Sequence, residues 1–126
     1  MSTNEPADRR VARRWTPDLI VEGFTPVSDM FLEHYSELGL TSTEAMLIIQ
    51  LMKHKWDKEH PYPSFGTLAR RMGMTPTSVR NHARNLEKKG CLRRIHRQGS
   101  TNQFDLTPLF HKLEQLRNKI MGFPQA

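Results

Sequence analysis

The stretch Ser64–Gly90, SFGTLARRMGMTPTSVRNHARNLEKKG, predicts two short helices joined by a tight turn. Ser64 and Thr75 carry the hydroxyl side chains that favour helix N-caps, because their oxygens can accept hydrogen bonds from free backbone amides. Gly73 lies between the two helices and Gly90 follows the second, where glycine commonly ends a helix. These signals place a pair of short helices at the centre of the chain.

The second of these helices, residues 75–89, has two contrasting faces. Pro76 suits its first position, and a spacing of 100° per residue places Val79, Ala83 and Leu86 together on a buried side. The opposite side carries arginine, asparagine and hydroxyl side chains, which match the hydrogen-bonding groups and methyl groups of base edges. We assign base contacts to Thr77, Ser78, Arg80, Asn81 and Arg84. The alternative is an ordinary solvated face.

Residues 91–106 predict a hairpin, with strands at 91–97 and 103–106 around a polar turn. Thr107 is expected to cap a last helix at 108–121. A basic hairpin beside such a helix can contact the DNA backbone or enter a narrow minor groove, although charge can also simply protect an edge strand from aggregation. Backbone contacts are assigned to Ser64, Thr75, Lys88, Lys89, Arg93, Arg94, Arg97, Ser100, Thr101 and Asn102.

The N-terminal part of the chain predicts a flexible basic arm at residues 1–14 and one domain at residues 15–126. Residues 15–27 are expected to be an extended lead-in that packs through Trp15, Leu19, Ile20 and Phe24. The arm can reach a minor groove or remain a solvated tail.

Two further helices are expected before this pair, at residues 27–38 and about 42–58. Thr41 and Glu44 have the spacing of a capping box. The helix that they open is apolar on nearly every side in its first turns, which predicts the central helix of the core. The fold class is therefore mainly α with a small β-hairpin.

The charge of the chain is concentrated in one segment. The formal net charge is +6 over 126 residues, but residues 70–97 carry nine basic residues and one acid, a net +8. Residues 18–44 carry six carboxylates and neither lysine nor arginine. A basic segment on such a pair of helices favours a polyanion partner, with the acidic segment facing away from it.

Several classes of function are not supported by the sequence. The single Cys91 excludes a disulfide framework, and the six histidines lack the spacing of a metal site. No phosphate-binding glycine loop, secretory signal or membrane-spanning apolar run is present. We expect a cytoplasmic, nucleoid-associated protein that is not an enzyme and has no cofactor and no metal.

The chain resembles the winged helix-turn-helix family over roughly residues 41–106. The matching features are Leu68-Ala69 in the first helix, Gly73 in the turn, Val79 and Leu86 in the second helix, and the sequence LEKKG before the hairpin. The resemblance implies a winged helix with added N- and C-terminal helices, a helix-turn-helix at 64–90 and a wing at 91–106. It also implies that helix 75–89 enters the major groove.

Residues 27–44, VSDMFLEHYSELGLTSTE, and the apolar helix after them also resemble the N-terminal domain of DnaD-type proteins, which act in bacterial replication initiation. The sequence therefore supports two alternative functions. One is a sequence-specific double-stranded DNA-binding regulator of transcription from a bacterium, plasmid or phage. The other is an accessory module for replication initiation or partition, which acts through protein contacts and non-specific DNA binding.

Self-association is also expected, because the last helix has a wide apolar stripe. Part of the stripe must cover the core, and the remainder can pair with a second subunit to form a homodimer. The candidate dimer residues are Phe110, Leu113, Leu116 and Ile120. The lead-in at 15–27 and the acidic helix at 27–38 are alternative dimer surfaces.

Overall fold

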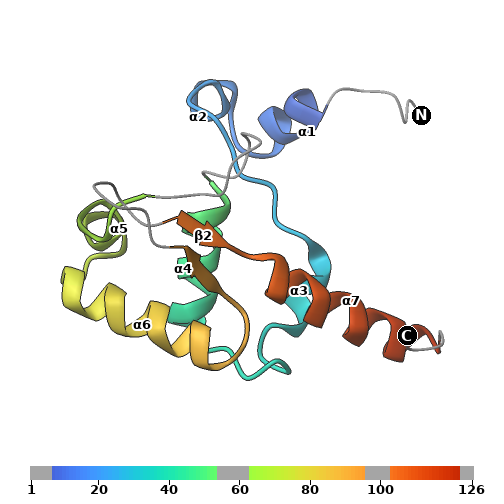
Figure 1. Cartoon of the computed structure of the whole chain (residues 1–126). Helices are drawn as coiled ribbons and strands as arrows, with labels where there is room; N and C mark the ends of the chain where they lie inside the picture. Colours follow the sequence, from blue (N-terminus) through green and yellow to red (C-terminus); the bar gives the residue numbers. More distant parts are fainter. Residues whose placement is uncertain (1–6, 54–62, 96–102, 123–126) are drawn as a thin grey trace.

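A computed structural model of the chain describes residues 7–53, 63–95 and 103–122. Its elements are α1 (Ala7–Arg14), α2 (Pro17–Val21), α3 (Asp29–His34), α4 (Ser42–Met52), α5 (Phe65–Met72), α6 (Pro76–Lys88), β1 (Arg93–Ile95), β2 (Gln103–Asp105) and α7 (Thr107–Met121). The two strands pair antiparallel, with Arg94 opposite Phe104. The expected fold class, mainly helical with a small hairpin, is confirmed (Figure 1).

The helices α5 and α6 begin at the expected caps. The Ser64 hydroxyl accepts a hydrogen bond from the Thr67 amide at 3.0 Å, and the Thr75 hydroxyl accepts one from the Ser78 amide at 3.1 Å. Gly73 joins the helices with φ +67°, a left-handed conformation that other residues rarely adopt. The local signals therefore determine where this pair of helices starts and turns.

The core lies where α6 packs on α4 and α5. On α6 the buried residues are Val79, Ala83 and Leu86, as the helical spacing predicts. The hairpin and α7 contribute further buried side chains, among them Phe104 and Leu109. One face of α6 is thus fixed in the core, and the opposite face is left to solvent.

The central helix α4 starts with the expected capping box. The Thr41 hydroxyl accepts a hydrogen bond from the Glu44 amide at 3.1 Å, and the Glu44 carboxylate accepts one from the Thr41 amide at 2.8 Å. The helix is less uniformly buried than expected, because Met46 is 45% exposed. The predicted continuation over residues 54–58 lies outside the described residues.

The start of α7 corrects one prediction. Thr107 does not cap this helix but is its first residue, and the N-cap position belongs to Leu106, which makes no side-chain cap bond. The Thr107 amide instead donates to the Asp105 carboxylate at 3.0 Å. A carboxylate at the end of β2 therefore serves the first amide of α7.

The N-terminal region differs most from the sequence-based expectation. Within the segment predicted as a flexible basic arm, residues 7–14 form the helix α1, and their alanines and arginines are good helix formers. The expected lead-in contains the helix α2, because Thr16 caps it and Pro17 suits its first position. In Figure 1, α1 and α2 lie next to each other at one end of the molecule.

The lead-in does not pack in the core as predicted. Trp15 is 68% exposed, and Leu19 and Phe24 are exposed as well, whereas Ile20 is half-buried. The helix expected at 27–38 is shorter, since α3 ends at His34 and turns lead to Gly39. This helix packs on α7.

Candidate nucleic-acid interface

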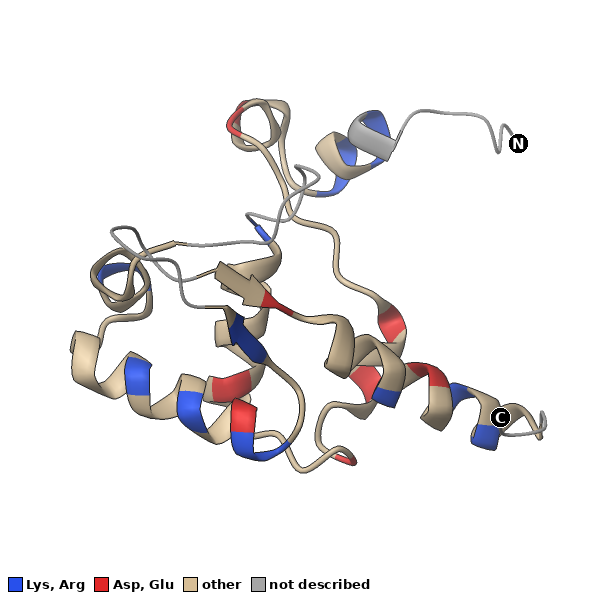
Figure 2. Ribbon diagram, in the orientation of Figure 1, with Lys and Arg blue, Asp and Glu red and all other residues tan. Residues whose placement is uncertain are grey.

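The outward face of α6 carries most of the predicted base contacts. Thr77, Arg80, Asn81 and Arg84 are exposed, whereas Ser78 is half-buried near the N-cap. Lys88, a predicted backbone contact, is also exposed, one turn beyond Arg84. Figure 2 shows basic residues at successive turns along α6. One helix therefore presents a continuous row of polar and cationic side chains.

The only acid of α6, Glu87, borders this face and is paired within the protein. The Glu87 carboxylate pairs with the Arg94 guanidinium of β1 at 2.8 Å, and it is about one-third exposed. An uncompensated carboxylate beside the row would repel phosphate, and the Arg94 guanidinium compensates the charge of Glu87. Sequence spacing alone does not show this, because the partner lies on another element.

Arg94, which the sequence predicts to contact the DNA backbone, lies on the inner face of the hairpin. Its side chain is only 12% exposed, and its guanidinium lies 5.7 Å from the centre of the Phe65 ring. In the antiparallel hairpin Arg94 lies opposite the buried Phe104, so its side chain is on the inner face of the hairpin. We therefore leave Arg94 out of the proposed DNA contacts.

Lys89 also has a partner within the protein. Its ammonium contacts the Glu44 carboxylate at 2.5 Å and donates to the Gly39 carbonyl at 2.8 Å. Burial of the Glu44 carboxyl acts to raise its pKa, but the hydrogen bonds from Lys89 and from the Thr41 backbone outweigh it, so the pKa is lowered. The Lys89 charge thus neutralises a buried acid, and we leave Lys89 out of the proposed DNA contacts.

The other residues predicted to contact the DNA backbone have different environments in the structure. Ser64 and Thr75 are helix caps, so their side-chain oxygens already accept amide hydrogen bonds. Arg93 is well exposed and pairs with the buried Asp105 at 2.7 Å. The predictions at Arg97, Ser100, Thr101 and Asn102 lie outside the described residues.

The sequence analysis does not identify Phe65 as part of this surface. The ring is half-buried at the first position of α5, and the Arg80 guanidinium lies 5.6 Å from its centre. Arginine beside an aromatic face is attracted by the ring quadrupole. An aromatic residue next to the hydroxyl cap of a helix was the only signal in the sequence.

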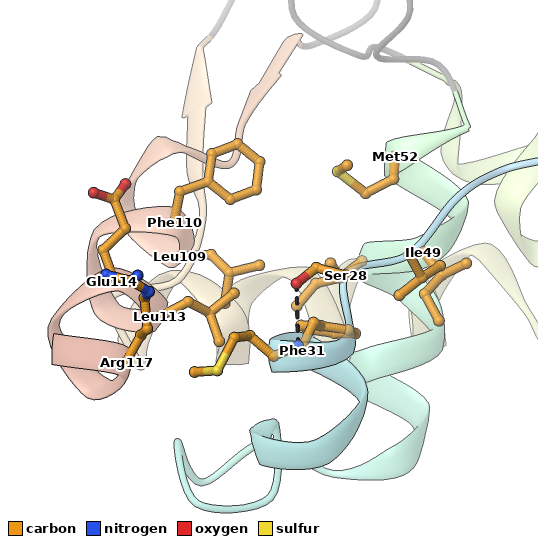
Figure 3. A pocket seen from close by; sticks show the side chains of 12 residues that line it. Ser28, Phe31, Ile49, Met52, Leu109, Phe110, Leu113, Glu114 and Arg117 are labelled. Atoms are coloured by element: carbon orange, nitrogen blue, oxygen red, sulfur yellow. Dashed lines mark hydrogen bonds between the residues drawn. The ribbon is translucent and has the colours of Figure 1, made fainter. Parts of the chain in front are cut away.

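A separate apolar pocket lies between α3, α4 and α7, with a cavity volume of about 240 Å³. Figure 3 shows Phe110 and Met52 on opposite sides of it and Leu109 and Leu113 on the α7 wall. Of the candidate dimer residues, Leu113 is therefore a core residue, while Phe110 and Leu116 are half-buried. Ile120 remains 55% exposed.

The described residues outside the α6 row include one cysteine. Cys91 is fully buried between α6 and β1, and burial raises the pKa of its thiol. No group of three or more His, Cys, Asp or Glu side chains in the described part could hold a metal ion. None of the described helices is both long enough and apolar enough to cross a membrane.

Comparison with known proteins adds family information. The model of the DnaD N-terminal domain family matches residues 27–121. The crystal structure of the N-terminal domain of DnaD protein from Geobacillus kaustophilus is 23% identical with a TM-score of 0.65, over 90% of this chain and 96% of that chain. The YusO protein from Bacillus subtilis is 16% identical with a TM-score of 0.47, over 97% of this chain and 88% of that chain. No curated protein matches the chain.

Proposed function

Because this chain belongs to the family of DnaD N-terminal domains, we propose that it is an accessory module of DNA replication that binds double-stranded DNA. The DNA-binding surface is the outward row of α6, defined by Thr77, Arg80, Asn81, Arg84 and Lys88. Family membership favours a replication role over regulation of transcription. In this arrangement α6 lies in the major groove and the hairpin approaches the flanking backbone.

The observation that supports DNA binding most directly is that the α6 row is cationic and exposed, while the one acid that borders it is already paired. The ion pair of Glu87 with Arg94 keeps the nearest carboxylate beside the hairpin, and Arg80, Arg84 and Lys88 remain exposed. Cations one turn apart on a helix can follow phosphates along a groove, and each neutralised phosphate releases bound counterions. The row thus combines a suitable shape with a suitable charge.

Reading of the DNA sequence is a finer proposal for the same surface. Arg84 can bind guanine through two hydrogen bonds and Asn81 can bind adenine in the same manner. Both side chains are exposed and lie on the α6 row. Selection of bound duplexes from a random pool tests this proposal, since an enriched motif indicates base readout and an unenriched pool indicates backbone binding alone.

Binding is tested by fluorescence anisotropy with a labelled duplex over a range of salt concentrations. Lys88→Ala is expected to reduce the slope of log K against log salt by about 1, the contribution of one phosphate contact. Lys119→Ala, which removes an exposed cation of α7, is the matched control and should leave the slope unchanged. Equal effects of the two variants would exclude the α6 row as the binding surface.

We also propose that the chain forms a homodimer through the C-terminal half of α7. The support is the exposure of Ile120 and Met121 at the end of a helix whose other apolar residues pack inward. Sedimentation over a range of concentrations should show a dimer that Ile120→Glu dissociates, because a carboxylate would be buried in the contact. A monomer at every concentration, or a dimer unaffected by this change, would contradict the proposal.

A further inference from the structure

Side chains from four elements, α5, α6, β1 and β2, meet at one aromatic ring. Phe65 is the first residue of α5, and its ring centre lies 6.0 Å from that of Phe104 on β2. The guanidinium carbons of Arg80 and Arg94 lie 5.6 and 5.7 Å from the same ring centre. Arg80 comes from α6 and Arg94 from β1, so the ring links the helix in the groove to the hairpin.

The two arginines have different environments although they share the ring. Arg94 is largely buried and pairs with Glu87, which compensates its charge within the protein. Arg80 is exposed, and the ring contact is the interaction that the structure gives for its guanidinium. Two like charges at one ring are acceptable because a carboxylate neutralises one of them. Arg80 is therefore the member of the pair whose charge faces outward.

A long arginine side chain loses rotational freedom when it binds DNA, and this loss weakens binding. A contact that already limits the guanidinium to one region before binding reduces that loss. A cation beside an aromatic face at an exposed site contributes an attraction equivalent to about a two- to fivefold change in an equilibrium constant. Phe65 can thus improve DNA affinity without touching DNA.

We propose that Phe65 is a positioning residue for DNA binding, which orients the Arg80 guanidinium toward the groove and connects α6 to the hairpin. This inference rests on the proposed function, because it assumes that Arg80 contacts DNA. The inference extends the proposed function, because it assigns a role to Phe65, a residue outside the α6 row. Phe65→Leu is expected to weaken duplex binding about two- to fivefold.

A double-mutant cycle on duplex affinity tests the proposal, with Phe65→Leu, Arg80→Ala and the double variant. If Phe65 acts through Arg80, Phe65→Leu has no further effect once Arg80 is alanine. Phe65→Tyr, which keeps an aromatic face, should restore affinity. Should Phe65→Leu fail to fold, Phe65→Met replaces it, since it retains apolar volume without the ring.

A purely structural role would give a different pattern. Loss of the contact with Phe104 lowers the free energy of unfolding in both backgrounds, so thermal unfolding is measured beside affinity. Phe31→Leu is the matched control, because it removes a buried ring from α3, which packs on α7. This control should lower stability and leave duplex affinity unchanged.

The inference is overturned if Phe65→Leu leaves affinity unchanged, or if it weakens binding equally with and without Arg80. It is also overturned if Phe65→Tyr binds as weakly as Phe65→Leu. Arg84→Ala and Lys88→Ala separate this failure from failure of the proposed function. If they weaken binding while Phe65→Leu does not, only the positioning role is wrong; if they too have no effect, DNA binding by the α6 row is wrong.

Discussion

The adjacent residues Lys88 and Lys89 provide a test of how α6 divides its charge between stability and binding. Lys88 is exposed on the outward row, and Lys89 contacts the buried Glu44 of α4. We expect Lys89→Met to lower the free energy of unfolding and to leave duplex affinity nearly unchanged. We expect Lys88→Met to lower duplex affinity and to leave stability within about 0.5 kcal/mol of the wild type.

The expected loss of stability follows from the burial of Glu44. Removing one partner of a fully buried ion pair commonly costs about 3–5 kcal/mol, because the other charge is left buried and uncompensated. The Glu44 side chain is 2% exposed, but that of Lys89 is 34% exposed, so water can partly replace the ammonium. The Thr41 amide also continues to donate to Glu44. We therefore expect a loss of about 2 kcal/mol, below the fully buried range.

The effect of Lys89→Met should depend on pH. The pKa of Glu44 in the folded protein is lowered from the ordinary value of 4.5, so the ionised carboxylate contributes stability above that pH. This contribution is lost as the pH falls through the folded-state pKa. The difference in stability between the wild type and Lys89→Met is therefore expected to be full at pH 7 and to shrink below pH 4.5.

Urea unfolding followed by circular dichroism measures the free energy of unfolding, and fluorescence anisotropy with a labelled duplex measures affinity. Both are carried out on the full chain at the same pH and salt concentration. An unchanged stability of Lys89→Met, or a loss that is independent of pH, would refute the role of the ion pair. A loss of duplex affinity in Lys89→Met as large as in Lys88→Met would refute the division of charge.

Three further changes address other parts of the fold, each measured by urea unfolding. Asp105→Ala is expected to destabilise the protein by about 2 kcal/mol, because the Thr107 amide loses its acceptor and Arg93 its partner; a loss below about 0.5 kcal/mol would contradict this. Gly73→Ala should cost about 1–2 kcal/mol, since its φ of +67° is unfavourable for alanine, and an unchanged midpoint would show that the turn can relax. Leu86→Ala should cost about 2–5 kcal/mol as a fully buried leucine, and a smaller loss would indicate that the α6 packing collapses into the cavity.

The sequence predicts the helices α5 and α6 and the turn between them well because their signals are local. The hydroxyl caps at Ser64 and Thr75 and the turn at Gly73 act within a few residues, so their consequences can be worked out from spacing. The buried face of α6 follows in the same way from helical periodicity. The exposed side chains of the α6 row are then a direct result of which residues are buried.

The sequence is least informative where the interaction partner lies far away along the chain. Lys89 contacts Glu44 across 45 residues, and the charge pattern alone gives no sign of that contact. Arg94 is turned inward by its place opposite Phe104 in the hairpin, although its neighbour Arg93 is exposed. The short helix α2 was missed because Pro17 and Gly23 suggested an extended chain, whereas the cap at Thr16 favours a helix.

The burial of Cys91 has a practical consequence. It is the only cysteine of the chain, it is fully buried, and it lies at the junction between α6 and the hairpin. A thiol-labelling reagent can therefore react only when this junction opens, because both access and the raised pKa limit the thiolate. The labelling rate of the unmodified protein then measures how often the hairpin separates from α6. Bound duplex that bridges the two elements would slow that reaction, so the native cysteine serves as a kinetic reporter of their coupling.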